Sequence, residues 1–158
     1  MRFSRTNGGV VQLQPQALNQ VLSFRQLTDD APESGGMLLG RLVEKSEDVV
    51  VDYVSRPSPN DNRSRFSFFR SREDAQKIVN NAWAGSDGTS IYLGEWHTHP
   101  EHNPRPSISI DIPSWRTTTR TAHFEQDFLL FAIVGQVSIR MWEISKFSDA
   151  LIQLRRFE

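Results

Sequence analysis

The segment GEWHTHPEHNPRPSISID (residues 94–111) holds three of the four histidines of the chain. Residues 89–99, TSIYLGEWHTH, are mostly β-branched, aromatic or otherwise apolar until Pro100, which predicts a buried strand that ends at the proline. Alternate side chains of a strand point to the same face. His97 and His99 are therefore expected on one face, where their imidazoles can converge on one metal ion.

A third ligand for such a site is available at the end of the same segment. A catalytic zinc ion uses three protein ligands and keeps an open position for water. Asp111 offers carboxylate oxygens, and the intervening prolines stiffen the path that would return it over the histidines. A His-x-His pair also occurs in many proteins that bind no metal, so a merely polar loop is the alternative on this evidence alone.

Other residues of the segment compete for roles. His102 could supply another nitrogen ligand, but Pro100 ends the strand before it. Glu95 shares the histidine face, so it either orients an imidazole from behind or is a structural carboxylate. Trp96 and Thr98 point to the opposite face, and we assign neither a role.

A candidate general base lies far upstream in the chain. Glu33 begins the segment ESGGMLLG, and the glycines at 35 and 36 allow close approach of backbone and ligand. A glutamate in a loop is usually just solvated. Combined with the histidine pair, Glu33 becomes a specific candidate for the base that accepts the proton of a zinc-activated water.

The hydrophobic pattern predicts an α/β fold. Strands are expected at residues 35–43, 48–55, 89–99, 128–134, 137–145 and 150–157, the last at an edge. Helices are expected at residues 14–27, at 71–85 with Ser71 and Asp74 forming a capping box, and after Asp111. The polar segment SRPSPNDNRSR (55–65) is predicted to be a long loop. Strands grouped with three helices indicate a mixed α/β sandwich.

The composition excludes several classes of protein and of site. The chain has 158 residues, about the size of one domain, and its formal net charge of −1 provides no strong field for nucleic acid. It has no cysteine, which excludes disulfides, thiolate ligands and cysteine nucleophiles. No segment approaches the roughly 20 apolar residues that cross a bilayer, and no signal peptide is evident, so a cytoplasmic location without a membrane partner is expected.

Arginines are concentrated around the predicted polar loop. Such density can bind an acidic substrate surface or a phosphate backbone, but a solvated face is the commoner explanation, and nucleic acid is not an expected partner. The loop is also a candidate to clamp a flexible peptide by added-strand pairing. The arginines are Arg56, Arg63, Arg65, Arg70 and Arg72.

The segments ESGGMLLG, GEWHTHP and PSISID together resemble the JAMM motif of the MPN+ (JAB) metalloproteases, which is Glu, then His-x-His-Pro, then Ser and Asp. The resemblance is strongest over residues 33–115. It implies a zinc-dependent isopeptidase that releases ubiquitin or ubiquitin-like proteins from amide-linked conjugates. It also implies a three-layer α/β/α MPN (JAB) fold with a mixed central sheet, similar to cytidine deaminases, with residues 1–158 as a single catalytic domain.

The resemblance also implies a role for each matching residue. His97, His99 and Asp111 would be the ligands of the zinc ion (Zn2+), and Glu33 would be the general base. A serine would help to stabilise the oxyanion of the tetrahedral intermediate.

The position of that serine departs from the family pattern. The motif has Ser-x-x-Asp, whereas residue 108, three before Asp111, is isoleucine here. Counting from His99 gives the family spacing for Ser107, which places the extra residue between Ser107 and Asp111. Ser107 is therefore favoured, and Ser109 is the second choice.

Within the family, the chain resembles a bacterial branch found in mobile elements and anti-phage operons. The shared features are SRPSPNDNRSRFSFFR (55–70), YLGEWHTHPE (92–101) and Trp115. This branch includes isopeptidases of CBASS operons, which release a nucleotidyltransferase (CD-NTase) that an E1/E2-like enzyme has conjugated through its C-terminus. The implied partners are a protein with a flexible C-terminal tail and an E1/E2-like enzyme of the same operon. Trimming of a sulfur-carrier protein and a metal-free MPN scaffold that only binds partners are the alternatives.

Overall fold

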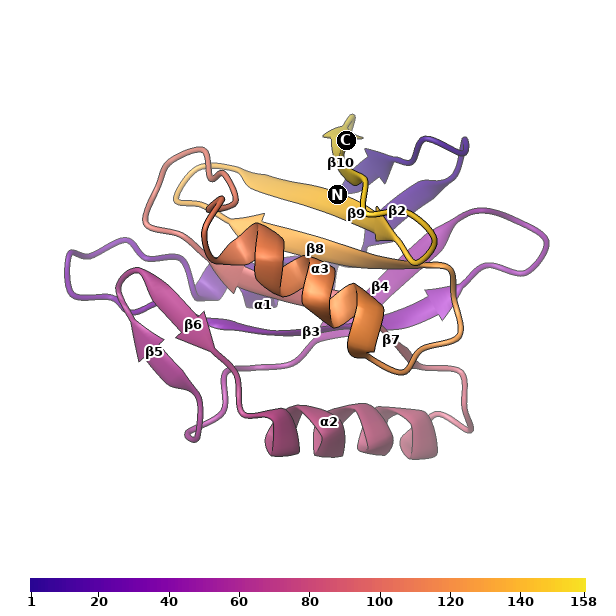
Figure 1. Cartoon of the computed structure of the whole chain (residues 1–158), viewed down its shortest axis with the longest axis horizontal. Helices are drawn as coiled ribbons and strands as arrows, with labels where there is room; N and C mark the ends of the chain where they lie inside the picture. Colours follow the sequence, from indigo (N-terminus) through magenta and orange to yellow (C-terminus); the bar gives the residue numbers. More distant parts are fainter.

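The computed structural model describes residues 1–158, which form ten strands and three helices (Figure 1). The strands are β1 (Arg2–Ser4), β2 (Val10–Leu13), β3 (Gly35–Leu42), β4 (Val49–Val54), β5 (Asn62–Ser64), β6 (Ser67–Phe69), β7 (Ile91–Thr98), β8 (Phe128–Val134), β9 (Ile139–Ser145) and β10 (Leu151–Arg156). The helices are α1 (Pro15–Ser23), α2 (Arg72–Gly85) and α3 (Asp111–Thr121). No helix combines the length and apolar character that a membrane span requires.

Eight of the strands form one closed, mixed sheet in the order β1-β10-β9-β8-β7-β3-β4-β2. The pairs β7–β8 and β2–β4 are parallel, and the other pairs are antiparallel. This confirms the predicted α/β class and the mixed sheet.

The closure of the sheet differs from the predicted three-layer α/β/α arrangement. The short strands β1 and β2, which the sequence pattern did not predict, pair with each other and join β10 to β4. The sheet therefore has no open edge and curls into a barrel instead of lying flat between two helical layers. Residues 151–156 are a strand, as predicted, but β10 lies between β9 and β1, so its predicted edge position is wrong.

The two faces of the barrel sheet carry different apolar clusters. Ala17 and Val21 of α1 pack in the large cluster on one face, which also contains Trp96 of β7. On the other face, Trp115 of α3 stacks on Phe131 with ring centroids 4.9 Å apart, and α2 covers residues of β3. Because side chains alternate along β7, Trp96 points to the α1 side and its neighbours point toward α3.

The segment predicted as a long polar loop contains a strand. β5 and β6 form a separate antiparallel hairpin, with Asn62 opposite Phe69 and Ser64 opposite Ser67. Phe68 packs so closely on Gly35 that a β-carbon there would lie 2.6 Å from the phenyl ring. The hairpin is thus held beside the start of β3, which pairs with the end of β7.

The start of α2 is bonded to residues 58–61, which lead into β5. The Ser71 hydroxyl accepts a hydrogen bond from the backbone N–H of Asp74 (3.3 Å), as predicted. The Asp74 carboxylate does not complete the predicted capping box, because it accepts from the Ser58 hydroxyl and from Asn60 (2.8 Å). The Ser71 N–H donates to Asp61 instead (2.7 Å). The cap therefore ties the segment before β5 to the helix.

Candidate metal centre

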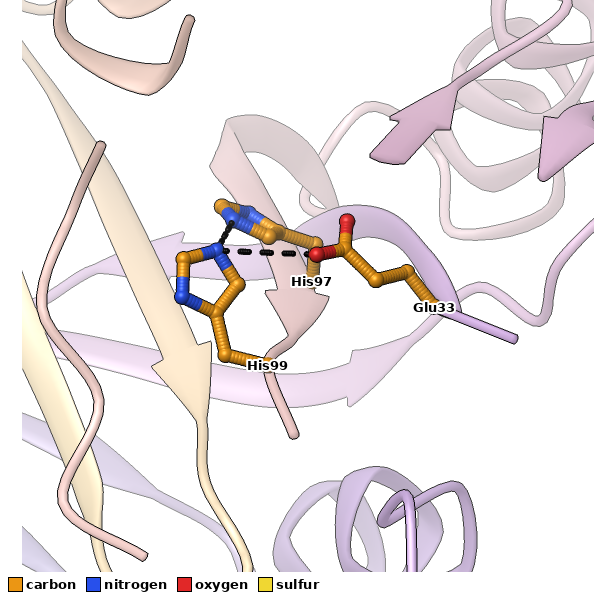
Figure 2. Close-up of side chains that lie close together, drawn as sticks. All are labelled: Glu33, His97 and His99. Carbon is orange, nitrogen blue, oxygen red and sulfur yellow. Dashed lines mark hydrogen bonds and ion pairs between the residues drawn. The ribbon is translucent and has the colours of Figure 1, made fainter. Parts of the chain in front are cut away.

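Four predicted site residues meet at one end of the barrel, although they come from three separate segments. His97 and His99 lie at the end of β7, Glu33 precedes β3, and Asp111 is the first residue of α3. The antiparallel register pairs Gly35 with His97, so Glu33 lies alongside the end of β7. Figure 2 shows the Glu33 carboxylate pointing toward the two imidazole rings. Strand alternation and register therefore assemble the cluster.

The donor atoms of the two histidines and Asp111 are in mutual contact. His97 Nε2 and His99 Nε2 are 3.0 Å apart. Asp111 Oδ1 lies 3.3 Å from His97 Nε2, and Asp111 Oδ2 lies 3.3 Å from His99 Nε2. In a tetrahedral zinc site with ligand distances of about 2.0–2.1 Å, donor atoms are about 3.3–3.4 Å apart. The chemistry and spacing of these three side chains therefore fit zinc.

The two carboxylates of the cluster are placed differently. Asp111 contacts both imidazoles, whereas Glu33 Oε1 approaches only His99 Nε2, at 3.8 Å. Glu33, His97 and His99 still form a group whose possible ligand atoms lie within 4.8 Å of one another. The shorter contacts to both rings make Asp111 the better third ligand, and they leave Glu33 beside the site.

The same environment drives the pKa values of the two carboxylates apart. Burial raises the pKa of Glu33 to about 8, although the nearby His99 acts to lower it. Burial also opposes ionisation of Asp111, but hydrogen bonds from His97 and His99 hold its pKa well below the usual range. For His99, burial lowers the pKa, and the hydrogen bond and charge of Asp111 outweigh that effect and raise it. Asp111 thus stays ionised, while Glu33 can exchange a proton.

The structure places Ser107, and not Ser109, in the site. The Ser107 N–H donates to Asp111 Oδ2 (2.6 Å), and its hydroxyl accepts from the Asp111 N–H (2.9 Å). Its own hydroxyl proton is still free to be donated. Ser107 lines the cleft, whereas Ser109 is exposed and does not.

The cluster lies in a cleft of about 420 Å³. The β5–β6 hairpin and the start of α3 both contribute to its lining, and the exposed apolar residues among them are Phe66, Phe69 and Ile110. The apolar residues that line it are Phe66, Phe68, Phe69, Trp96, Pro100, Ile110 and Trp115. A cleft of this volume with exposed apolar residues can bind a few side chains of a polypeptide.

The contacts of His102 and Glu95 show which of the roles considered for them the structure allows. His102 is exposed in the loop and makes no contact with the cluster. Glu95 binds Arg70 (2.5 Å) and accepts a hydrogen bond from the Tyr92 hydroxyl (3.0 Å), so it is a structural carboxylate. A residue that the sequence argument missed, Glu101, lies 3.7 Å from His99 Nδ1.

Three of the five clustered arginines make contacts within the chain. Arg63 donates to the backbone carbonyl of Glu33 (2.6 Å), Arg65 donates to that of Thr28 (2.8 Å), and Arg70 binds Glu95. The prediction of a solvated face is therefore wrong for these three residues. Sequence spacing gave no indication that Arg63 contacts the segment of Glu33.

The family described as prokaryotic homologs of the JAB domain matches residues 15–145. The chain belongs to this family. The match spans Glu33, both histidines and Asp111, and it confirms the resemblance to JAMM/MPN proteins. The four residues of the cluster thus all lie within the matched region.

Relatives of known name are similar over most of the chain. A protein of Vibrio cholerae serotype O1 named CD-NTase/cGAS isopeptidase is 38% identical over 134 residues, which cover 85% of this chain and 81% of the relative. An Escherichia coli protein of the same name is 38% identical over 105 residues, 66% of this chain and 65% of the relative. These names support the resemblance to the CBASS branch.

A solved structure supports the fold alone. The solution structure of a Desulfitobacterium hafniense protein has a TM-score of 0.57 and 19% sequence identity, and it covers 90% of this chain and 88% of its own. The overall arrangement of strands and helices is therefore shared with a solved protein.

Proposed function

We propose that this chain is a zinc-dependent isopeptidase. It hydrolyses the amide bond between the C-terminus of a conjugated protein and an amine of the target. The observation that carries the proposal is the contact of His97, His99 and Asp111 at 3.0–3.3 Å, with Glu33 beside them in the lining of a cleft. A scaffold that only binds partners has no use for a buried, charge-rich cluster of this kind.

Each residue of the cluster has a separate task in this reaction. When it is bound, zinc supplies a Lewis acid that lowers the pKa of a coordinated water toward about 7 and polarises the scissile carbonyl. His97, His99 and Asp111 would hold the ion. Glu33 accepts the proton of the attacking water and delivers it to the leaving amine. Ser107 donates its hydroxyl proton in a hydrogen bond to the oxyanion.

The substrate proposal follows from the lining of the cleft and from the names of the relatives. A cleft lined by the cluster and by exposed apolar residues can accept a C-terminal tail, and relatives 38% identical are named CD-NTase/cGAS isopeptidase. We therefore propose a CD-NTase conjugate as the substrate, with the conjugate made by an E1/E2-like enzyme of the same operon, in the cytoplasm.

A defined conjugate tests this function. The substrate is a CD-NTase whose C-terminal carboxyl is joined through an isopeptide bond to a lysine of a fluorescent protein. We expect cleavage into the two parent proteins, abolished by a chelator and restored by zinc. Cleavage that continues unchanged in the chelator would rule out the zinc mechanism, and an intact conjugate with the zinc-loaded chain would rule out this substrate class.

A further inference from the structure

The backbone of Glu33 is held by the β5–β6 hairpin and not by the barrel sheet. Its N–H donates to the carbonyl of Ser64 (2.7 Å), and its carbonyl accepts from Arg63 Nε (2.6 Å). Arg63 Nη2 also donates to the Ser34 hydroxyl (2.5 Å). The first residue of β3 is Gly35, so the sheet itself does not begin until two residues after Glu33. One guanidinium thus bridges Glu33 and its neighbour.

On the other side, Ser34 is joined to the strand that carries the histidines. The Thr98 N–H donates to the Ser34 carbonyl (2.8 Å), and the Ser34 N–H donates to the Thr98 hydroxyl (2.9 Å). The Thr98 hydroxyl in turn donates to Gln26, whose amide nitrogen donates to the Arg65 carbonyl (2.8 Å). Ser34, Thr98 and Gln26 are 2%, 0% and 0% exposed, so this network is shielded from water and rigid.

The network fixes Glu33 relative to the histidines through bonds that run on both sides of Ser34. Thr98 lies between His97 and His99 in the sequence. The two hydrogen bonds between Ser34 and Thr98 therefore fix the position of the segment before β3 along β7. The Glu33 carbonyl and the Ser34 N–H belong to one planar peptide unit, which is therefore bonded to Thr98 on one side and to Arg63 on the other. The Arg63 contacts hold the carbonyl end of this unit, which the bonds to Thr98 do not reach.

The hairpin that supplies these bonds also forms a wall of the cleft. Phe66 and Phe69 line the cleft and are 71% and 56% exposed. The hairpin is a two-stranded sheet separate from the barrel, and such hairpins are marginally stable alone in water. Its position therefore depends on contacts such as those of Arg63 and Phe68 with the segment around Glu33.

We propose that Arg63 is a positioning residue that holds the Glu33 carboxylate toward the metal ligands, and that it thereby links the hairpin wall of the cleft to the general base. The inference rests on the proposed isopeptidase function for its kinetic consequence. Its structural content, the orientation of Glu33 by Arg63, stands without that function. Arg63 touches no reacting atom and acts only through the Glu33 backbone and Ser34.

The kinetic test compares Arg63→Ala with a matched control. Arg65→Ala removes a neighbouring arginine that ties the same hairpin to Thr28 and does not contact Glu33. Misplacement of a reacting group by about 1 Å can cost about 10²-fold in rate. We expect Arg63→Ala to lower kcat by about 10- to 100-fold with a small change in KM and wild-type zinc content, and we expect Arg65→Ala to keep the wild-type kcat.

A conservative variant separates positioning from general loosening of the hairpin. Lysine carries one nitrogen at its tip and cannot bond the Glu33 carbonyl and the Ser34 hydroxyl with the fork that arginine uses. Arg63→Lys should therefore give an intermediate kcat. A rise in KM alone in Arg63→Ala, or an equal loss of kcat in Arg65→Ala, would show that Arg63 only supports the substrate-binding wall and would overturn the proposal.

A crystal structure of zinc-loaded Arg63→Ala tests the inference without any substrate. We expect the Glu33 carboxylate to leave its position 3.8 Å from His99 Nε2, while the contacts among His97, His99 and Asp111 persist. Should Glu33 keep its position, the positioning role is wrong even if the wild-type chain cleaves the conjugate. Should the wild-type chain not cleave the conjugate, the displacement of Glu33 still decides the role of Arg63.

Discussion

The Arg5–Glu143 pair and the cluster around His97 and His99 are both buried groups of charged side chains, and they differ in how charge is balanced. Arg5 Nε and Nη2 bind the two oxygens of Glu143 at 2.8 and 3.0 Å, and Nη1 donates to the Glu47 carbonyl at 2.6 Å. Its guanidinium also lies 4.0 Å from the centroid of the Phe128 ring. This group is complete without any further ligand.

The metal cluster has no such balance. It brings two carboxylates and two imidazoles together, places two imidazole nitrogens 3.0 Å apart, and raises the pKa of Glu33 to about 8. A divalent cation would stabilise these side chains, because their possible ligand atoms face one another and neither carboxylate is paired with a lysine or arginine. A buried charge that is paired with an opposite charge of the same chain supports the fold. A buried group of possible metal ligands without such a pairing indicates a binding site for a cation.

Removal of the metal should have the largest effect of the changes considered for the two groups. We expect a chelator to abolish cleavage of the conjugate and to lower the melting temperature, because the zinc-bound fold is stabilised by mass action. Zinc should restore both, and inductively coupled plasma spectrometry should find about one zinc per chain. A chain that is equally active and equally stable without metal would contradict the comparison.

Loss of the base should have the next largest effect. General acid–base catalysis contributes about 10²–10⁴-fold, so Glu33→Gln should lower kcat by about that factor. The zinc content should stay at the wild-type level, because the variant keeps His97, His99 and Asp111. Wild-type turnover in this variant would remove Glu33 from the mechanism.

Removal of one partner of the Arg5–Glu143 pair should lower the stability of the fold and leave the metal centre unchanged. Glu143→Ala leaves the Arg5 charge without its partner, in a group whose side chains are 4% and 14% exposed. We expect a loss of about 3–5 kcal/mol in the free energy of unfolding, measured by urea denaturation, with wild-type zinc content in the folded protein. Glu158→Ala is the control, since the exposed Arg2–Glu158 pair should contribute at most about 1 kcal/mol. Equal losses in the two variants would contradict the distinction.

The metal-free chain should also lose stability as the pH rises. Folded Glu33 has its pKa raised from 4.5 to about 8, so between these values the folded chain binds a proton that the unfolded chain has released. The free energy of unfolding should therefore fall across this window, by up to about 1.4 kcal/mol per pH unit. Glu33→Gln carries no such group, and its metal-free form should show a weaker pH dependence in urea titrations. The same slope in both proteins would count against this assignment.

The smallest of these effects is expected from Ser107. Removal of one oxyanion donor costs about 10²-fold or more in known hydrolases, but the metal ion shares this task, so Ser107→Ala should lower kcat by about 10- to 100-fold. The exposed Ser109→Ala is the control and should keep the wild-type rate. A larger effect in Ser109→Ala, measured with the same conjugate, would reverse the choice between the two serines.

The sequence predicts the elements that carry the proposed metal ligands, because their signals are local. Strand alternation brings His97 and His99 to one face, and the proline-rich loop returns Asp111 to them. β3, β4, β7, β8 and β9 also occur where apolar runs predicted them. Local periodicity was sufficient in each case.

The features that the sequence did not predict depend on long-range pairing. β1 and β2 have three and four residues, too few for a clear periodic pattern, and they acquire strand structure by pairing with β10 and β4. Arg63 lies in a segment rich in proline, asparagine and serine, a composition typical of loops. Its contact with Glu33 links residues 30 positions apart through a hairpin whose position only the fold defines.

The pairing of β1 with β10 also has a consequence for the order of folding. It joins residues at opposite ends of the chain, such as Phe3 and Arg156, and so requires the longest loop closure in the molecule. We expect this seam to form last during synthesis, after β3, β7 and β8 have already paired. Until then, the open edges of β1 and β10 can pair with other chains, which makes the unfinished barrel the stage most prone to aggregation. Pulse-labelling hydrogen exchange should show the amides of β1 and β10 protected after those of β7, and simultaneous protection would contradict this order.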